Sequence, residues 1–519
     1  MTPLIVIFIY IFITFVIGLV AWWRGRVTAS DFYIAGRSQG FIVTALAIMA
    51  TFFSSFAMLG APGMLYKGGI GFVFFMLNVP ICGALIWVLG KPLWALGKRF
   101  GYITPSDLVA DYYKSDTLRV LVSILGIIYV IPYAVIQFQG GGYLFDVITQ
   151  TSDVHLGWFH LSGRQVTIGS YTTSSFIAGA VFLASVTMIY TIMGGMRAVC
   201  WTNVFQGGLL VIGMLLGGVV TVYILGGVTG LFEQVAAIQS EGAPAGSFIT
   251  LPGPAGMYPV SMILTFTLVA SFGTMASPSQ WMRYYSAKNP AALRRSMLIF
   301  AIVLTACYIF GTAFIGLGGR VLFPDVTPDT VFLEILHKYL PLALASFFVT
   351  TIMAAAMSTA NGNLHSFAAL ITQDIYVPFF RKNAGQGELV WVARLLITLA
   401  SIVSLWISIQ PDIGMIVQIG LISMAVALQM FPSLIGPLWW KGQTRAATIW
   451  GIVLGMAVLM VTFKPVWFGL AFKPSPLGIH YGFWGLMVNM LAVLVISAFT
   501  TKPAQADIQK YHEILKKIE

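Results

Sequence analysis

The chain has 519 residues, of which 58% are hydrophobic and 9% are charged, and its formal net charge is +11. An ordinary soluble domain carries roughly 25% charged residues, and no soluble fold has an interior large enough for apolar runs that recur along a whole chain. This composition excludes a soluble enzyme, a nucleic-acid binder and a disordered scaffold, and it indicates an all-α integral membrane protein.

Thirteen apolar runs are long enough to cross a bilayer as helices, which takes about 20 residues. In chain order, the predicted spans are 4–22, 41–66, 70–89, 120–145, 176–193, 204–225, 259–276, 297–317, 342–371, 389–409, 413–439, 447–463 and 483–499. The first run is followed by Trp22, Trp23 and Arg24. An aromatic anchor with a positive charge favours a retained helix with its amino end outside over a cleaved signal peptide.

Lys and Arg are distributed unevenly between the two sides when alternate loops are assigned to opposite faces. Only six of the 28 fall outside, whereas Asp and Glu divide almost evenly. The six are Lys67, Arg164, Arg320, Lys338, Lys464 and Lys473. A bias confined to Lys and Arg is what the positive-inside rule predicts. We therefore expect a multi-pass protein of the plasma or inner membrane, with its N-terminus outside and its C-terminus in the cytoplasm.

The predicted spans divide the chain into six parts. These are an N-terminal helix and cytoplasmic loop (1–40), a first five-helix repeat of spans 2–6 (41–225), an extracellular loop (226–258), a second, inverted repeat of spans 7–11 (259–440), two peripheral C-terminal helices (441–500) and a cytoplasmic tail (501–519). In the tail, Ile508, Tyr511, Leu515 and Ile518 recur at helical spacing between lysines. This pattern predicts a short helix on the inner surface, attracted by anionic lipid.

Two of the predicted spans are interrupted by small, polar and helix-breaking residues. Span 2 contains Thr51, Ser54 and Ser55 before a Gly-Ala-Pro-Gly run, and span 7 is followed directly by Ser277-Pro278. The two lie five spans apart, an odd number, so repeats starting at them would be inverted. That arrangement is typical of transporters that hold solute and ion near the midplane, where paired helices break. For any single Gly or Ser pair, simple helix packing is the alternative.

Span 9 carries adjacent hydroxyls at Ser358 and Thr359, with Ala355 one turn earlier. Hydroxyl and carbonyl oxygens without nitrogen or sulfur suit a hard cation such as Na⁺. A hydroxyl inside a helix also commonly bonds its own i−4 carbonyl. The residues alone leave the cation cage and the packing interpretation open.

Candidate solute-binding residues are polar side chains on the interrupted helices and their predicted neighbours. They are Thr51, Ser54 and Ser55 in span 2, Tyr133 and Gln137 in span 4, Thr267, Ser271 and Thr274 in span 7, and Gln429 in span 11. Interhelical hydrogen bonding is the alternative role for each of them.

No predicted span has Asp, Glu, Lys or Arg near its centre, which argues against a proton relay. His365, in span 9, is the one titratable candidate at depth, and a packing histidine is the alternative.

Several strings at matching topological positions carry a family resemblance. They are Asp31–Ser38 (DFYIAGRS), Gly194–Val199 (GGMRAV) followed by Trp201-Thr202-Asn203, and Met357-Ser358-Thr359 with Thr372–Tyr376 (TQDIY). Over essentially its whole length the chain resembles the sodium:solute symporter family, which includes bacterial proline and pantothenate permeases and sodium/sugar cotransporters. The resemblance implies thirteen helices, an inverted five-plus-five core in spans 2–11 as in amino-acid transporters, with one extra N-terminal and two extra C-terminal helices, and sodium-driven uptake.

The resemblance also implies a sodium site between the break of span 2 and span 9. The implied ligands are the carbonyls of Ala50, Phe53 and Ala355 with the hydroxyls of Ser358 and Thr359. This set agrees with the oxygen cage read from span 9, so the cage becomes the favoured interpretation.

The chain departs from the family pattern at two positions. Several relatives carry Asp where this chain has Phe52, and many carry Asp where it has Asn203. The second position is linked in some relatives to an additional sodium site, so we expect one Na⁺ per solute here.

These features predict sodium-coupled uptake of a small organic solute by alternating access. Neutral donors and the positive end of a half-helix can hold a carboxylate, which favours a monocarboxylate, pantothenate or an amino acid such as proline. A sugar, polyol or urea symporter, a channel-like facilitator and a membrane sensor on the same scaffold are the alternatives. No enzyme motif is recognised. The expected partners are the solute and the lipid bilayer, with no nucleic acid and no obligatory protein partner.

Overall fold

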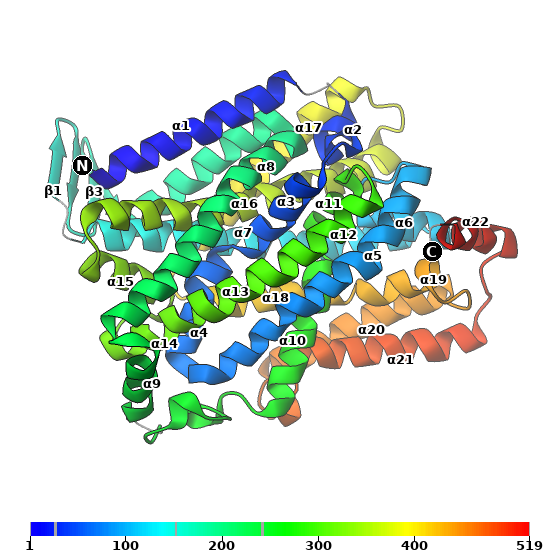
Figure 1. Ribbon diagram of the computed structural model, residues 1–519. Helices are drawn as coiled ribbons and strands as arrows, with labels where there is room; N and C mark the ends of the chain where they lie inside the picture. Colours follow the sequence, from blue (N-terminus) through cyan, green and yellow to red (C-terminus); the bar gives the residue numbers. More distant parts are fainter. Residues whose placement is uncertain (1, 25–27, 151–152, 240–242, 518–519) are drawn as a thin grey trace.

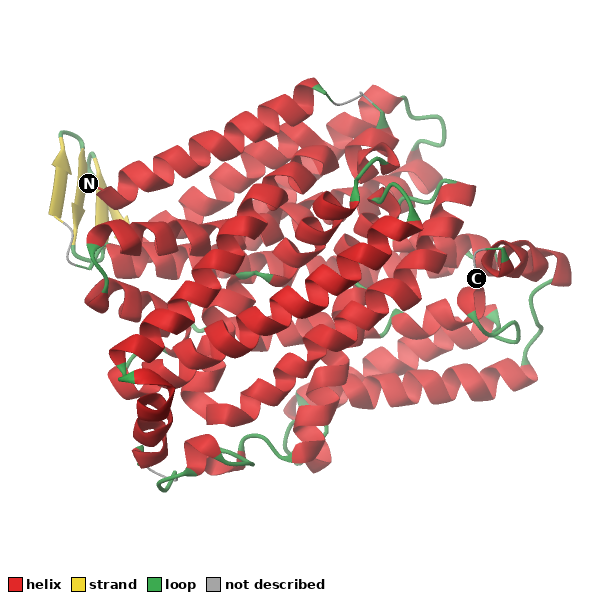
Figure 2. Ribbon diagram, viewed as in Figure 1, coloured by secondary structure: helices red, strands yellow, loops and turns green. Residues whose placement is uncertain are grey.

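The computed structural model describes residues 2–24, 28–150, 153–239 and 243–517. Apolar helices lie side by side in a bundle, and the strands lie at one end of it (Figures 1 and 2). Among the described residues, ten helices are long and apolar enough to cross a membrane, and the bent pair Val260–Met275 and Pro278–Ser286 makes eleven. The count of thirteen spans stays a prediction.

The first half of the bundle runs from the N-terminal helix to the long helix α8. Its helices are α1 (Thr2–Trp23), α2 (Ala29–Ile34), η1 (Ala35–Arg37), α3 (Phe41–Phe52), η2 (Phe56–Gly60), α4 (Ala61–Gly68), η3 (Gly69–Leu77), α5 (Asn78–Phe100), α6 (Pro105–Tyr113), α7 (Asp116–Ile148) and α8 (Ser175–Ile224). Predicted spans 5 and 6 both lie in α8. Gly195 divides α8 with a φ of 55°, a left-handed backbone that favours glycine.

The second half begins after a loop that carries the short helix α9 (Gly227–Ala237). Its helices are α10 (Val260–Met275), α11 (Pro278–Ser286), α12 (Pro290–Ile299), η6 (Phe300–Leu304), α13 (Thr305–Cys307), η7 (Tyr308–Thr312), α14 (Ala313–Leu322), η8 (Pro328–Thr330), α15 (Val331–Tyr339), α16 (Leu342–Ile371), η9 (Thr372–Phe380), α17 (Gln386–Ser408), α18 (Ile416–Leu428), η10 (Phe431–Leu434), α19 (Ile435–Leu438), α20 (Arg445–Phe463), α21 (Tyr481–Phe499) and α22 (Gln505–Lys516). Short 3₁₀ turns η4 (Ser247–Ile249), η5 (Pro254–Gly256), η11 (Pro465–Phe468) and η12 (Pro476–Gly478) lie in the connecting loops.

The sequence did not predict the small sheet between α7 and α8. Four strands, β1 (Asp153–Leu156), β2 (Phe159–Ser162), β3 (Gln165–Ile168) and β4 (Tyr171–Ser174), pair antiparallel in sequential order. In Figure 1 the sheet lies beside the start of α1, and α22 lies at the opposite end of the bundle. The two ends of the chain are therefore on opposite sides of the bundle.

The C-terminal tail forms the predicted helix, but its apolar face packs on protein. Tyr511 is fully buried, and Ile508 and Leu515 are nearly so; Ile518 lies outside the described residues. The Tyr511 hydroxyl donates a hydrogen bond to Asp111 at 2.5 Å and lies 2.9 Å from the Tyr102 hydroxyl. Because this face is already covered by protein, α22 has only its lysine-bearing side left for lipid.

Candidate functional site

The break in the second span lies between α3 and η2. Helix α3 ends at Phe52, and Phe53 has a non-helical ψ of 76°. The backbone amide of Ser55 donates to Oε1 of Gln137 at 2.9 Å, and Nε2 of Gln137 donates to the carbonyl of Tyr133 at 2.9 Å. A side chain of α7 thus replaces the helical partner that the unwound turn has lost.

Span 9 meets this break through its paired hydroxyls. The Ser358 hydroxyl lies within hydrogen-bonding distance of the carbonyls of Ala50 (2.9 Å) and Ala355 (3.0 Å). The Thr359 hydroxyl lies 3.4 Å from the Ala50 carbonyl, and both hydroxyl side chains are buried. Four of the five predicted sodium residues are therefore in contact through oxygen atoms, and Phe53 lies at the break itself, three residues after Ala50.

Three predicted solute-binding hydroxyls are buried without a hydrogen-bond partner. They belong to Ser54, Ser55 and Thr274. A buried polar group usually has a partner, and one left unpaired costs free energy. Gly140 on α7 gives Ser55 its room, because a Cβ at this position would overlap the Ser55 hydroxyl. The unpaired hydroxyls of Ser54 and Ser55, which lie at the break, provide donors and acceptors for a polar solute.

Thr51 joins the break to the half-helix α11. Its hydroxyl donates to the Ile48 carbonyl at 2.6 Å and accepts from Nε2 of Gln280 at 2.8 Å. Gln280 was not among the predicted site residues, because span 7 was expected to end at Ala276. The sequence did carry one sign of it, since Gln280 is a polar residue two positions after Pro278.

The remaining predicted residues lie in other seams of the bundle. Thr267 and Ser271 face the third span, with their hydroxyls 3.4 Å from the carbonyls of Phe74 and Asn78 respectively. Tyr133 stacks on Tyr129 with ring centroids 5.3 Å apart. The contacts of Thr267 and Ser271 do not reach the break. Tyr133 borders it, because its carbonyl accepts from Gln137 and its side chain lies near Ser54.

Gln429 also lies away from the break. Its Nε2 donates to the carbonyl of Gly482 at 3.1 Å, and its Oε1 accepts from Nδ2 of Asn489 at 3.3 Å. These hydrogen bonds join span 11 to the peripheral helix α21. They match the alternative role given above for Gln429, which is hydrogen bonding between helices.

One charged residue is buried in a helix that the predicted spans did not include. Arg283 of α11 is 1% exposed, and its guanidinium donates from Nε to the Ala47 carbonyl (3.0 Å) and from Nη1 to the Ser279 carbonyl (2.6 Å). The sequence pattern placed Arg283 in an inner loop because it ended span 7 at Ser277-Pro278. The chain instead bends by 50° there and continues as an interior helix.

His365 lies in a packed setting. Its Nε2 is 3.3 Å from the Tyr33 carbonyl, and its ring lies 5.2 Å from that of Phe32. These contacts with α2 support the packing interpretation over the relay.

The two positions that depart from the family pattern are both buried. The Asn203 Oδ1 accepts from Nδ2 of Asn361 at 3.4 Å, and the same Nδ2 donates to the Tyr190 hydroxyl at 2.8 Å. Phe52 packs edge-on against Phe300. A neutral amide network and an aromatic pair thus occupy these two positions.

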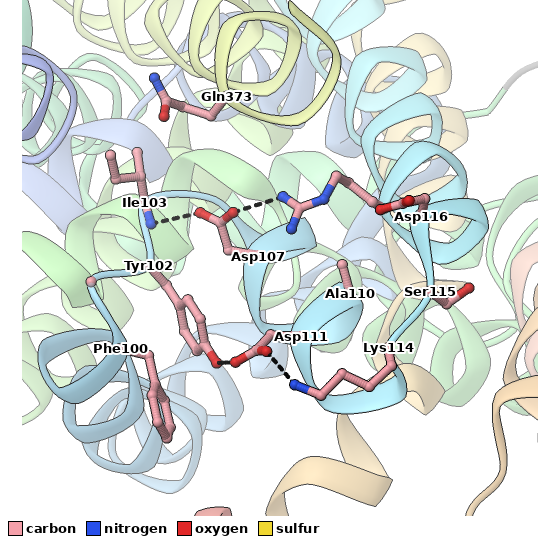
Figure 3. A pocket seen from close by; sticks show the side chains of 12 residues that line it. Phe100, Tyr102, Ile103, Asp107, Ala110, Asp111, Lys114, Ser115, Asp116 and Gln373 are labelled. Carbon is pink, nitrogen blue, oxygen red and sulfur yellow. Dashed lines mark hydrogen bonds and ion pairs between the residues drawn. The ribbon is translucent and has the colours of Figure 1, made fainter. Parts of the chain in front are cut away.

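A cavity of about 520 Å³ opens at the end of the bundle that carries α6 (Figure 3). Asp107 on its wall accepts from the Ile103 amide and pairs with Nη1 of Arg119 at 2.8 Å. Behind it, fully buried Asp374 accepts from the hydroxyls of Thr104 (2.7 Å) and Ser123 (2.9 Å).

Asp111 lies on the same cavity wall, close to α22. Burial acts to raise the pKa of Asp111, but hydrogen bonds from Lys114, Tyr102 and Tyr511 outweigh it and hold the pKa at about 2. The carboxylates of Asp107, Asp111 and Asp374 at this end of the bundle therefore each have a cationic partner.

At the opposite end, Asp329 of η8 is buried and holds α18. Its Oδ2 accepts from the Ile416 amide at the start of that helix at 3.0 Å, and Oδ1 has no partner. Burial raises the pKa of Asp329 to about 6, against the opposing effect of the Ile416 hydrogen bond.

The chain resembles characterised transporters in sequence. The Haemophilus influenzae sodium/pantothenate symporter is 28% identical over 463 residues, covering 87% of this chain and 85% of the relative. The Escherichia coli sodium/proline symporter is 25% identical over 536 residues, covering 98% and 97%.

The fold is shared with solved transporter structures. A substrate-bound, outward-open Na⁺-coupled sialic acid symporter superposes with a TM-score of 0.76 at 17% identity, covering 97% of this chain and 99% of that one. A nucleobase-cation-symport-1 family transporter in a closed conformation gives 0.55 at 15% identity, with 93% and 98% covered. The model of the sodium:solute symporter family matches residues 32–158 and 163–455, and the chain belongs to that family.

Proposed function

We propose that this protein imports a small carboxylate-bearing solute together with Na⁺, and that the ion binds between the break of span 2 and span 9. The observation that carries the proposal is the convergence of the Ser358 and Thr359 hydroxyls on the Ala50 carbonyl. Sodium is the coupling ion of the family. Carbonyl and hydroxyl oxygens are the ligands that a hard cation prefers, so the residues present fit this ion.

The proposed sodium ligands are the carbonyls of Ala50, Phe53 and Ala355 and the hydroxyls of Ser358 and Thr359. In the described structure both hydroxyls lie within hydrogen-bonding distance of the Ala50 carbonyl, which would share the ion. A bound cation requires both hydroxyls to turn their lone pairs inward, which releases span 9 from its direct bonds to span 2. Ion binding thereby biases the relative position of the two helices, and that bias is how it is linked to solute binding.

The proposed solute lies beside the same break, against the unpaired hydroxyls of Ser54 and Ser55 and the amide of Gln137. Pantothenate and proline are the solutes named for the relatives, and both carry a carboxylate. Hydroxyl and amide donors can hold a carboxylate, and the solutes of the relatives favour this class over a sugar. A neutral polyol or urea is the second candidate, because the same donors suit it.

The ratio of one Na⁺ per solute is part of the proposal. It is supported by the neutral amide of Asn203, which lies in a hydrogen-bonded network with Asn361. We also propose thirteen spans, with the N-terminus outside and the C-terminus in the cytoplasm of a plasma or inner membrane. The opposite placement of α1's start and α22 in Figure 1 supports an odd number of crossings.

The proposal is tested in proteoliposomes with an inward Na⁺ gradient, using radiolabelled pantothenate, proline and lactate. We expect accumulation of at least one acid above its external concentration, and none with an equal K⁺ gradient. Equilibration without accumulation would indicate a channel-like facilitator. Measuring the membrane potential at which net flux reverses then gives the coupling ratio, and a value of two would contradict the single-ion proposal.

A further inference from the structure

Arg283 is a buried cation beside the break whose charge no carboxylate balances. It lies on the half-helix α11 and is 1% exposed. Its Nε and Nη1 donate to backbone carbonyls, whereas Nη2 has no hydrogen-bond partner. Among the described residues, no Asp or Glu lies within ion-pairing distance of this guanidinium, in contrast to Arg119, which pairs with Asp107 and Asp374.

A buried charge of this kind is expensive in a membrane protein and is normally paired. Backbone carbonyls supply partial negative charge but do not neutralise a guanidinium. The planar fork of an arginine matches a carboxylate through two parallel hydrogen bonds. The free Nη2 beside a bonded Nη1 therefore has the donors that a carboxylate would use.

Nη2 of Arg283 occupies the room left by the missing side chain of a glycine in span 9. A Cβ built on Gly362 would lie 2.6 Å from Nη2. The guanidinium thus lies against bare backbone, one turn beyond Thr359. Any side chain at this position would displace the charged group.

Arg283 also lies one helical turn from the proposed ion and solute sites. Gln280 and Arg283 are three residues apart on α11 and so share a face. Gln280 bonds to Thr51 at the break, and Arg283 bonds to Ala47, one turn before it in α3. Since α3 begins at the end of the bundle that carries α6 and the cavity, this turn lies on the cavity side of the break (Figure 1).

We propose that Arg283 and Gln280 form a second, inward subsite that binds the carboxylate of the transported solute as it leaves the break. This inference rests on the proposed function and sharpens it, because it makes the negative charge of the solute a requirement. The carboxylate of the solute supplies the negative charge that Arg283 lacks. Gln280 lies between the solute site near Thr51 and the subsite near Ala47, so it can contact the solute as it moves from one to the other. A neutral solute would leave the guanidinium unpaired.

Three matched pairs of solutes test the subsite: pantothenate and panthenol, proline and prolinamide, and lactate and lactamide. Thermal stabilisation of the purified full-length protein in NaCl is measured with each compound, for the wild type and for Arg283→Gln, Arg283→Lys and Arg37→Gln. Arg37 is the matched control, because its guanidinium also donates to two carbonyls, those of Tyr285 and Tyr102, but lies near the cavity end.

We expect at least one acid to stabilise the wild type while its neutral analogue does so at least tenfold more weakly. Arg283→Gln removes this discrimination, Arg283→Lys keeps part of it, and Arg37→Gln keeps all of it. In every variant, Na⁺ alone still stabilises the protein, since the sodium oxygens are untouched.

The proposal is overturned if Arg283→Gln keeps the acid preference, or if only neutral compounds stabilise the wild type. A third result would also overturn the proposal. In it, none of the organic acids stabilises the wild type, and replacing chloride by nitrate changes the stability of the wild type but not that of Arg283→Gln. The anion bound by Arg283 would then be an inorganic ion and not the solute. Loss of sodium stabilisation in the wild type is a separate result, and it would contradict the proposed function instead.

Discussion

The middle of the bundle and its cavity end use polar groups in different ways. At the break of span 2, the groups that converge are neutral: the Ala50 carbonyl, the Ser358 and Thr359 hydroxyls and the Gln137 amide. At the cavity end, Asp107, Asp374 and Arg119 form ion pairs. Neutral hydroxyl and carbonyl oxygens can give up a hydrogen bond and bind a cation instead, and no charge is left unpaired when they do so. Ion pairs, in contrast, hold together the helices that they join. The difference indicates a mobile centre and a fixed end.

The largest effect is expected from breaking the fixed end at Asp374. Asp374→Leu leaves the hydroxyls of Thr104 and Ser123 and part of the Arg119 charge without an acceptor in a buried place. Removing one partner of a buried charged group costs about 3–5 kcal/mol. We expect a large drop in the thermal unfolding midpoint and in the yield of folded protein.

Asp116→Leu is the control for this variant, because Asp116 is an exposed carboxylate on the rim of the same cavity. If Asp374→Leu unfolds at the same temperature as this control, the cavity end is not held by the buried charge.

The next effect concerns the centre. Gln137→Leu removes the acceptor of the Ser55 amide and leaves that N–H buried, which costs about 1–3 kcal/mol. We expect at least a tenfold loss of solute affinity, because the unwound turn refolds toward a helix and reorients the Ser54 and Ser55 hydroxyls. Binding isotherms measure it.

Gln139→Leu is the matched control, since Gln139 lies on the same helix and its hydrogen bond to the Gly414 carbonyl is long, at 3.5 Å. Equal losses in the two variants would show that the effect comes from α7 as a whole.

A smaller, pH-dependent effect is expected from Asp329 at the opposite end. Its pKa is raised to about 6 in the folded protein from an ordinary value of 3.8, so the folded state binds the proton more tightly than the unfolded state. The carboxyl therefore favours folding below about pH 4, and this contribution is lost as the pH rises through about 6. Thermal unfolding followed from pH 5 to pH 7.5 should show a fall in stability that is absent in Asp329→Asn, which keeps an oxygen for the Ile416 amide. If the unfolding midpoints of the wild type and Asp329→Asn changed in parallel with pH, Asp329 would not be the group responsible.

The smallest effect is expected from the tail. Tyr511→Phe removes the hydroxyl that contacts Asp111 and Tyr102 but keeps the ring in place. The loss is about 1 kcal/mol, and it should appear as faster amide hydrogen exchange in α22 with little change elsewhere. Tyr339→Phe, a partly exposed tyrosine at the other end of the bundle, is the control. Unchanged exchange in α22 would mean that its apolar contacts alone hold it.

Much of the fold could be predicted because membrane helices are defined by long apolar runs, and all the predicted runs fall on helical segments. The proximity of Ser358 and Thr359 to the break of span 2 could also be predicted, because adjacent hydroxyls and an interrupted helix are visible in the sequence. The course of the chain after Ser277-Pro278 was not, since a proline there is equally typical of a span's end and of a bend. That ambiguity hid Gln280 and Arg283. Gln429 was misplaced for the opposite reason: its residue type fits a pocket, but only tertiary packing shows that it faces α21.

Sodium binding to Ser358→Ala is the most direct test of the ion site. The dependence of thermal stability on Na⁺ concentration, at constant ionic strength and without solute, is compared with that of Ser366→Ala. Ser366 is a buried hydroxyl on the same helix that bonds only its own preceding turn, at the Gly362 carbonyl. We predict a half-saturating Na⁺ concentration at least tenfold higher for Ser358→Ala than for the wild type, with Ser366→Ala unchanged. Superimposable sodium curves for all three proteins would contradict the site.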